Sequence, residues 1–178
     1  MIILENKFHL IFYPAFIFVT ILILIFQGSF LSFFFAGGSI PDLLLIIVLC
    51  LTFLGGEKRG MLIGIIAGFL QDIIFGPALG FFSLAKMLSA FLAGLASREI
   101  YRDQIIGPAL TVFLITFFHE MIIFLLVGLF WGGNNYNFYY ALKNLFLPRA
   151  LYHFILTIPI YPLLYRAEQK NFFYPFFK

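Results

Sequence analysis

The stretch GIIAGFLQDIIFGPALG, residues 64–80, decides the fold because it sets one carboxylate, Asp72, within a long apolar segment. The residues at every fourth position here lie along one face of a helix: Gly60, Gly64, Gly68, Asp72 and Gly76, followed by Gly80. Glycine at this spacing lets a second helix backbone approach closely, as in the packing of membrane helices. The row therefore predicts either a helix-packing seam within the chain or a binding seam for a partner.

Composition places the whole chain in a membrane. The sequence is 63% hydrophobic and only 11% charged, whereas a soluble domain is about half apolar and about a quarter charged. Segments such as FIFVTILILIF, residues 16–26, are apolar all round, and the alternation of a β-barrel strand is missing. We therefore expect an all-α integral membrane protein.

Six transmembrane helices are predicted, all within a single membrane domain of residues 1–178. A helix needs about 20 residues to cross the apolar core of a bilayer, so the second, third and fourth spans are short. The neutral stretch GSFLSFFFAGG, residues 28–38, is expected at the interface or as a half-helix. The predicted spans are residues 8–27, 41–54, 60–75, 81–97, 105–130 and 144–165.

Lysine and arginine positions predict the orientation. Three of the 11 basic residues, Lys86, Lys143 and Arg149, fall towards one side of the predicted spans. By the positive-inside rule both termini are cytoplasmic. The net charge of +3 is explained by this topology, so nucleic-acid binding is not expected. The other basic residues are predicted on the cytoplasmic side: Lys7, Lys58, Arg59, Arg98, Arg102, Arg166, Lys170 and Lys178.

An intramembrane carboxylate such as Asp72 requires a partner, because an unpaired charge in a bilayer is costly. Lys86, in the next predicted span and counted from the same side, is the expected partner. Asp72 is also placed to cap the amides at the start of a neighbouring helix. Both interpretations make Asp72 a structural residue, and a proton or substrate site is the functional alternative.

The stretch GGSIPDLLLIIVL, residues 37–49, carries the signals of a helix start. Ser39 is a candidate N-cap, Pro41 suits the first turn, and Asp42 complements the positive end of the helix dipole. These residues are predicted to be structural.

The stretch FFHEMIIF, residues 117–124, contains half of a zinc-protease motif. The HExxH motif needs a second histidine where this chain has Ile123, so we reject a metal site. Glu120 lies inside the fifth predicted span and needs a partner there. Arg149 and His153 in the sixth span lie at a similar depth in the membrane, and either is a candidate partner. A proton relay or a docking point for a partner's polar group is the alternative. Catalytic residues and cofactors are not predicted.

Several of these features together resemble one known family. Gln27 at the end of the first span, PDLLLIIVL (41–49), a basic turn and GIIAGFLQDIIFGPALGFFSL (64–84) are similar to the rod shape-determining protein MreD family. The resemblance implies a multi-pass protein of the bacterial cytoplasmic membrane, without enzymatic activity. It also implies a six-helix fold resembling the substrate-binding subunits of energy-coupling-factor transporters. The family pattern falls on Pro41, Asp42, Gly68, Gln71, Asp72, Gly76 and Gly80.

The resemblance makes a membrane scaffold the leading hypothesis. Such a scaffold would bind the transmembrane and juxtamembrane parts of MreC. Indirectly it would link the MreB cytoskeleton to peptidoglycan synthesis by RodA and its partner transpeptidase. The alternative is a vitamin-binding transporter subunit. Such subunits typically carry an Ala-xxx-Ala pattern in the first span. The first span here has only Ala15, with the bulky Val19 four residues later, and this counts against the alternative. A third hypothesis is an intramembrane enzyme or proton carrier built on Glu120, His119 and Asp72. Homo-oligomerisation is left open.

Overall fold

The computed structural model describes residues 14, 16–31, 33, 39–101, 103–130 and 137–169. Within these ranges the chain is helical and contains no strand, which confirms the all-α class. The start of the first predicted span, most of the stretch 28–38 and the segment 131–136 between the last two predicted spans lie outside the described residues.

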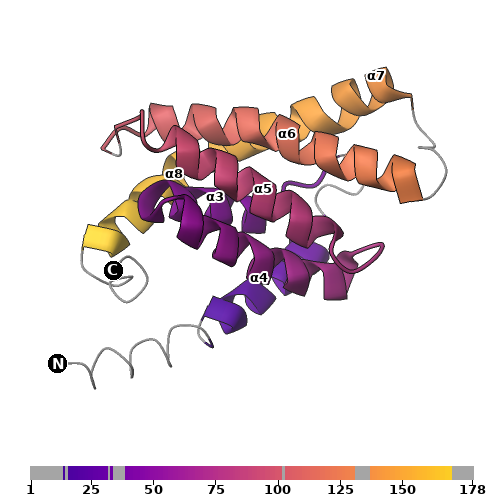
Figure 1. The fold of residues 1–178 in the computed structure, drawn as a ribbon, viewed down its shortest axis with the longest axis horizontal. Helices are drawn as coiled ribbons and strands as arrows, with labels where there is room; N and C mark the ends of the chain where they lie inside the picture. Colours follow the sequence, from indigo (N-terminus) through magenta and orange to yellow (C-terminus); the bar gives the residue numbers. More distant parts are fainter. Residues whose placement is uncertain are drawn as a thin grey trace.

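Six long helices make up the described part of the chain (Figure 1). A short helix, α7, and a π-helical segment, η2, lead directly into the last of them. One helix, α6, is long and apolar enough to cross a membrane by length and composition, and three shorter helices are also apolar. The elements are Phe16–Ser29, which passes into the π-helical η1 (Gln27–Leu31), then α3 (Leu43–Gly55), α4 (Glu57–Phe75), α5 (Phe81–Ala96), α6 (Ile106–Phe130), α7 (Phe138–Ala141), η2 (Leu142–Phe146) and α8 (Leu147–Gln169).

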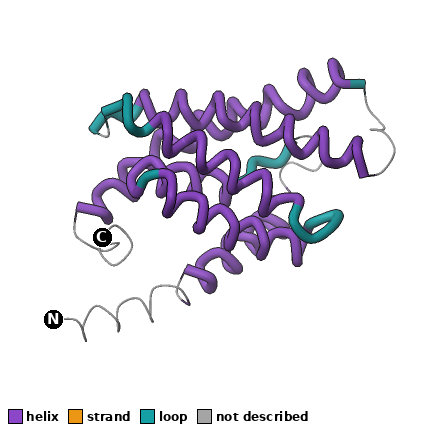
Figure 2. The backbone as a smooth tube through the Cα atoms, viewed as in Figure 1, coloured by secondary structure: helices purple, strands orange, loops and turns teal. Residues whose placement is uncertain are grey.

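The short helix α3 is the centre of the bundle. It contacts α4, α5, α6 and α8, and Figure 2 shows that helices make up nearly all of the described chain around it. Ten of its 13 residues are buried. The helix is apolar all round and packs against the other helices on all sides. At 1.5 Å per residue α3 is only about 20 Å long, so its polar N-terminus lies inside the bundle.

The N-terminus of α3 differs in detail from the predicted helix start. Asp42 is the N-cap, and its Oδ1 accepts a hydrogen bond from the amide of Leu45 at 2.9 Å. Ser39, predicted as the cap, instead donates to the carbonyl of Leu145 at 3.0 Å. Pro41 precedes the cap and is not part of the first turn. The carboxylate of Asp42 satisfies the helix-start amide directly, so the helix begins after it.

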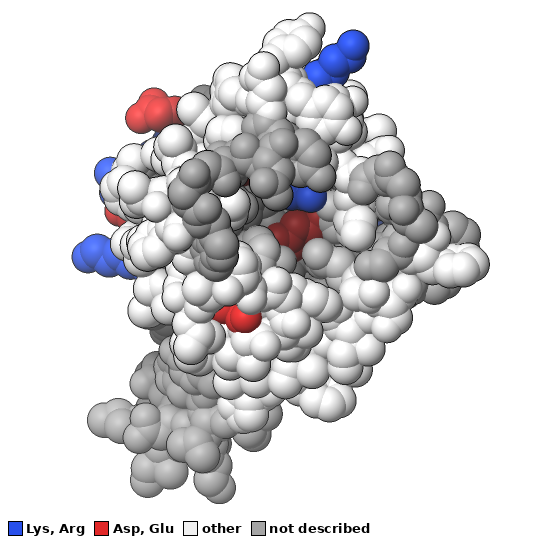
Figure 3. Space-filling model, turned by 90° about the vertical axis from the view of Figure 1, so that its right-hand side faces the viewer, with Lys and Arg blue, Asp and Glu red and all other residues white. Residues whose placement is uncertain are grey.

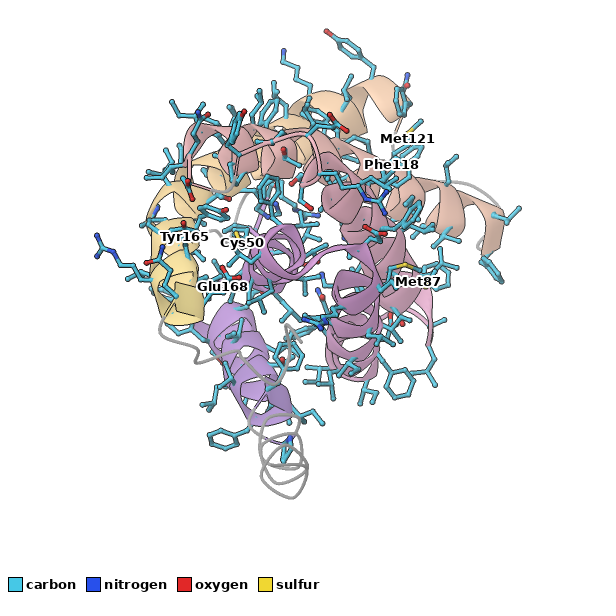
Figure 4. All side chains as sticks on the ribbon, turned by 60° about the vertical axis from the view of Figure 1, so that its left-hand side comes forward. Cys50, Met87, Phe118, Met121, Tyr165 and Glu168 are labelled. Atoms are coloured by element: carbon cyan, nitrogen blue, oxygen red, sulfur yellow. The ribbon has the colours of Figure 1, made fainter. Side chains whose placement is uncertain are left out.

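The outer surface of the bundle is strongly apolar. Exposed large hydrophobic side chains occur on every long helix of the described part except the central α3. Figure 4 shows Phe118 and Met121 on the outside of α6, whereas Cys50 of α3 points into the bundle. A surface of this kind indicates contact with lipid or with other apolar helices rather than with water.

Candidate functional site

The glycine row packs α4 against its own neighbour α5. A Cβ atom added at Gly68 would lie 2.6 Å from both the Phe82 carbonyl oxygen and the Ser83 nitrogen, and one added at Gly64 would lie 2.9 Å from the Lys86 carbonyl oxygen. All of these contacts are with backbone atoms, so the two helix backbones touch at this seam. Of the two predicted alternatives, the structure places these glycines in a helix-packing seam within the chain.

The remaining glycines of the row have other neighbours. Gly60 lies against the side chain of Thr52 in α3. Gly76 ends α4 where an added Cβ would lie 2.6 Å from the Cα of Asp72, and Gly80 has a φ of 103°, which favours glycine. Gly94 of α5, which the sequence analysis did not single out, lies against the backbone of Glu57 and continues the same seam.

Asp72 caps the start of α5. Its Oδ1 accepts from the amide of Phe82 at 2.8 Å, and its Oδ2 accepts from the amides of Gly80 and Ser83 at 3.0 and 3.1 Å. A carboxylate at a helix N-terminus satisfies amides that have no partner within the helix, and it complements the helix dipole. The predicted ion pair with Lys86 is therefore wrong, and the capping alternative describes Asp72.

We expect Asp72→Asn to be less destabilising than Asp72→Leu. An asparagine oxygen can keep the bonds from Gly80 and Ser83, but its NH₂ group would face the amide of Phe82. The loss should be about 1–3 kcal/mol for Asn and about 3–5 kcal/mol for Leu, which leaves three part-buried amides without an acceptor. Reversible unfolding in detergent measures both. Equal losses would show that the negative charge, and not the hydrogen bonds, dominates.

Lys86 forms its ion pair with Asp42, across the interface between α5 and the start of α3. The Nζ–Oδ2 distance is 2.5 Å, and the lysine side chain is completely buried. Gln71 of α4 donates to the same oxygen at 3.3 Å. Asp42 thus receives bonds from its own helix, from α4 and from α5, and these bonds let a charge pair persist in an apolar bundle.

His153 of α8 completes the network, and its hydrogen bonds determine its tautomer. The backbone amide of Asp42, which can only donate, donates to Nε2 at 2.8 Å. Nε2 therefore carries no proton, and a neutral ring must carry its proton on Nδ1. Nδ1 lies 2.8 Å from the hydroxyl oxygen of Thr116, whose own proton goes to the Val112 carbonyl at 2.8 Å. The neutral Nδ1–H tautomer satisfies every group in this chain of bonds.

This assignment predicts a specific nitrogen spectrum for His153. In protein labelled with ¹⁵N-histidine at neutral pH, the His153 resonances should show a protonated Nδ1 and an unprotonated Nε2. His153→Gln identifies the resonances by removing them. A protonated Nε2 would mean that the bond from the Asp42 amide is absent in solution.

Glu120 pairs with Arg149, one of its two predicted partners. The Nη1–Oε2 distance is 2.6 Å, and 26% of the arginine side chain is exposed. The other predicted partner, His153, is engaged by Asp42 and Thr116 and is not the partner. His119 lies 3.3 Å from the hydroxyl of Ser89 in α5. Figure 3 shows an acidic and a basic group side by side in a hollow of the molecular surface.

Two further polar contacts lie at the end that is predicted to be cytoplasmic. Arg98, after α5, forms an exposed ion pair with Glu57 at the start of α4. Its hydrogen bond lowers the pKa of the Glu57 carboxyl. The hydroxyl of Tyr165 in α8 donates to Asp103, before α6, at 2.5 Å. These contacts tie helix ends together at the surface, where a single pair contributes little stability.

The arrangement separates the groups that a proton carrier or enzyme would need. Asp72 contacts backbone amides, His119 contacts Ser89, and Glu120 contacts Arg149. These contacts do not bring the three residues together in one site, as an intramembrane enzyme or proton carrier built on them would require. Among the described residues no group of three or more His, Cys, Asp or Glu side chains could hold a metal ion. Asp72, His119 and Glu120 each contact a group on another helix, and this points to a structural role.

Comparison with known proteins identifies the family. The family described as rod shape-determining protein MreD matches residues 5–170, which is nearly the whole chain. No curated protein and no solved structure matches the sequence or the fold significantly. The expected likeness to transporter subunits therefore has no support from solved structures. Because this match covers nearly the whole chain, the chain belongs to the rod shape-determining protein MreD family.

Proposed function

We propose that this protein is a non-enzymatic, multi-pass scaffold of the bacterial cytoplasmic membrane that binds MreC. Family membership implies a role in rod shape determination and association with the membrane. The proposed mechanism is that the protein holds MreC and so links the MreB cytoskeleton to peptidoglycan synthesis by RodA and its partner transpeptidase. Both termini would be cytoplasmic.

One observation carries the scaffold interpretation. The charged groups inside the bundle are paired with groups on other helices: Asp42 with Lys86, Glu120 with Arg149, and Asp72 with the amides that start α5. Side chains used in this way stabilise one arrangement of helices and are not available for a reaction. The apolar outer surface then remains for lipid and for partner helices.

Co-expression with MreC from the same genome tests the proposal. The tagged protein is purified in a mild detergent, and mass spectrometry identifies everything that elutes with it. A stoichiometric MreC complex without a bound small molecule is the expected result. A bound vitamin, or a transporter transducer subunit in place of MreC, would favour the alternative of a transporter subunit.

A further inference from the structure

Lys143 differs from the other two basic residues predicted on the outer side of the membrane. Lys86 pairs with Asp42, and Arg149 pairs with Glu120. Among the described residues, the ammonium group of Lys143 has no ion pair and no hydrogen bond, and the side chain is exposed. A lysine on the outer side runs against the positive-inside rule, so a charge partner outside the chain has to be considered.

The segment that carries this lysine, α7 followed by η2, is held firmly against α6. The rings of Phe138 and Phe146 pack edge-on against Phe124 of α6, with ring centroids 5.7 and 6.0 Å apart. Ser39 also donates a hydrogen bond to the carbonyl of Leu145 at 3.0 Å. The position of the segment in the membrane can therefore be counted along α6.

This count places α7 at the boundary of the apolar core. Phe124 follows Ile106, the first residue of α6, by 18 residues, which is about 27 Å along a helix. The apolar core of a bilayer is about 30 Å thick. Asp103 and Gln104, just before α6, are exposed and polar, and they mark the opposite boundary. Figure 1 shows α7 beside the end of α6 that lies away from this start.

The exposed side of the segment has the composition of a membrane interface. Tyr139 and Tyr140 are 70% and 50% exposed, and Lys143 is exposed four residues after Tyr139. Tyrosine is enriched where the apolar core meets the headgroups, because its ring is apolar and its hydroxyl is polar. The lysine stem can likewise lie along apolar surface while its ammonium reaches the headgroups. We name these three residues the interfacial face.

We propose that the interfacial face binds the phosphate of an anionic phospholipid, with the ammonium of Lys143 as the cation and the hydroxyl of Tyr139 as a hydrogen-bond donor. None of the described carboxylates pairs with Lys143, and at this depth a bilayer presents phosphate groups. The contact would fix the depth of α6 and α8 in the membrane, and with it the depth of the Glu120–Arg149 pair.

A tryptophan at position 139 tests the proposal. The single native tryptophan, Trp131, is replaced by phenylalanine, and Tyr139→Trp supplies a reporter that keeps a donor N–H. The protein is placed in phosphatidylcholine vesicles with a minor fraction of brominated phosphatidylglycerol or of brominated phosphatidylcholine, because bromine quenches a tryptophan that touches the lipid. The affinity for phosphatidylglycerol should be about fivefold higher, which corresponds to about 1 kcal/mol for one basic residue near a membrane surface.

Lys143→Gln in the same background should abolish this preference. Lys58→Gln is the matched control, since Lys58 is exposed at the start of α4, at the other end of the bundle, and it should keep the preference. In detergent without phospholipid, Lys143→Gln should unfold at the same temperature as the parent, so a lost preference is not a lost fold. Three results would each overturn the inference: no quenching by either lipid, equal quenching by both before the lysine is changed, or a preference that survives Lys143→Gln. None of them bears on the binding of MreC.

Discussion

Replacing Lys86 by methionine is expected to lower the free energy of unfolding by about 3–5 kcal/mol, the range for breaking a buried ion pair by removing one partner. Methionine fills much of the lysine volume, so little of this loss comes from packing. The loss comes from the carboxylate of Asp42, whose side chain is only 8% exposed and which would have no cation beside it. Reversible unfolding in mixed detergent micelles measures the change.

A double-mutant cycle separates the ion pair from the rest of the network. Asp42→Asn keeps an N-cap oxygen for Leu45 and removes the charge. Combined with Lys86→Met, it should restore much of the lost stability, because uncharged replacements of buried pairs are often close to neutral. Lys143→Met, at an exposed lysine of η2, is the control and should have little effect. Additive losses in the double variant would show that Asp42 and Lys86 do not interact.

The sequence was sufficient to predict the helices because their signals are local. Long apolar segments separated by glycine, proline and basic turns place the helix ends within a few residues of those in the structure, where residues are described. The seam was also predictable in part, since glycines every fourth residue mark a close approach of backbones. Gly94 carries the same signal in α5, four residues after Ala90.

The pairing of buried charges was harder to predict because it depends on the direction in which each side chain leaves its helix. Counting residues along a span estimates the depth of a side chain in the membrane. By this count Lys86 and Asp72 lie at similar depths, which is why a pair between them is predicted. Lys86, however, leaves α5 towards α3, where the short central helix brings Asp42 into the bundle. Depth also fails to decide the partner of Glu120, because Arg149 and His153 lie one turn apart on α8. The structure decides it, because Nε2 of His153 already accepts a hydrogen bond from the amide of Asp42.

The second large effect is expected at Gly68. Gly68→Ala should lower the unfolding free energy by about 1–3 kcal/mol, and Gly68→Leu should prevent the native packing of α4 on α5. The reason is that the added Cβ would lie 2.6 Å from the Phe82 carbonyl oxygen and the Ser83 nitrogen. Backbone atoms cannot rotate away, so the helices must separate. Thermal unfolding in detergent, together with size-exclusion chromatography, measures both variants.

Gly60 provides the matched control, because the atoms facing it belong to the side chain of Thr52. A second substitution, Thr52→Ala, should relieve part of the strain of Gly60→Ala, whereas no side-chain change can relieve Gly68→Ala. The same variants distinguish a packing seam from a partner-binding seam. If the seam serves packing within the chain, the folded fraction of Gly68→Ala binds MreC with wild-type affinity. Weaker binding by a fully folded variant would instead mean that MreC contacts the glycine row directly.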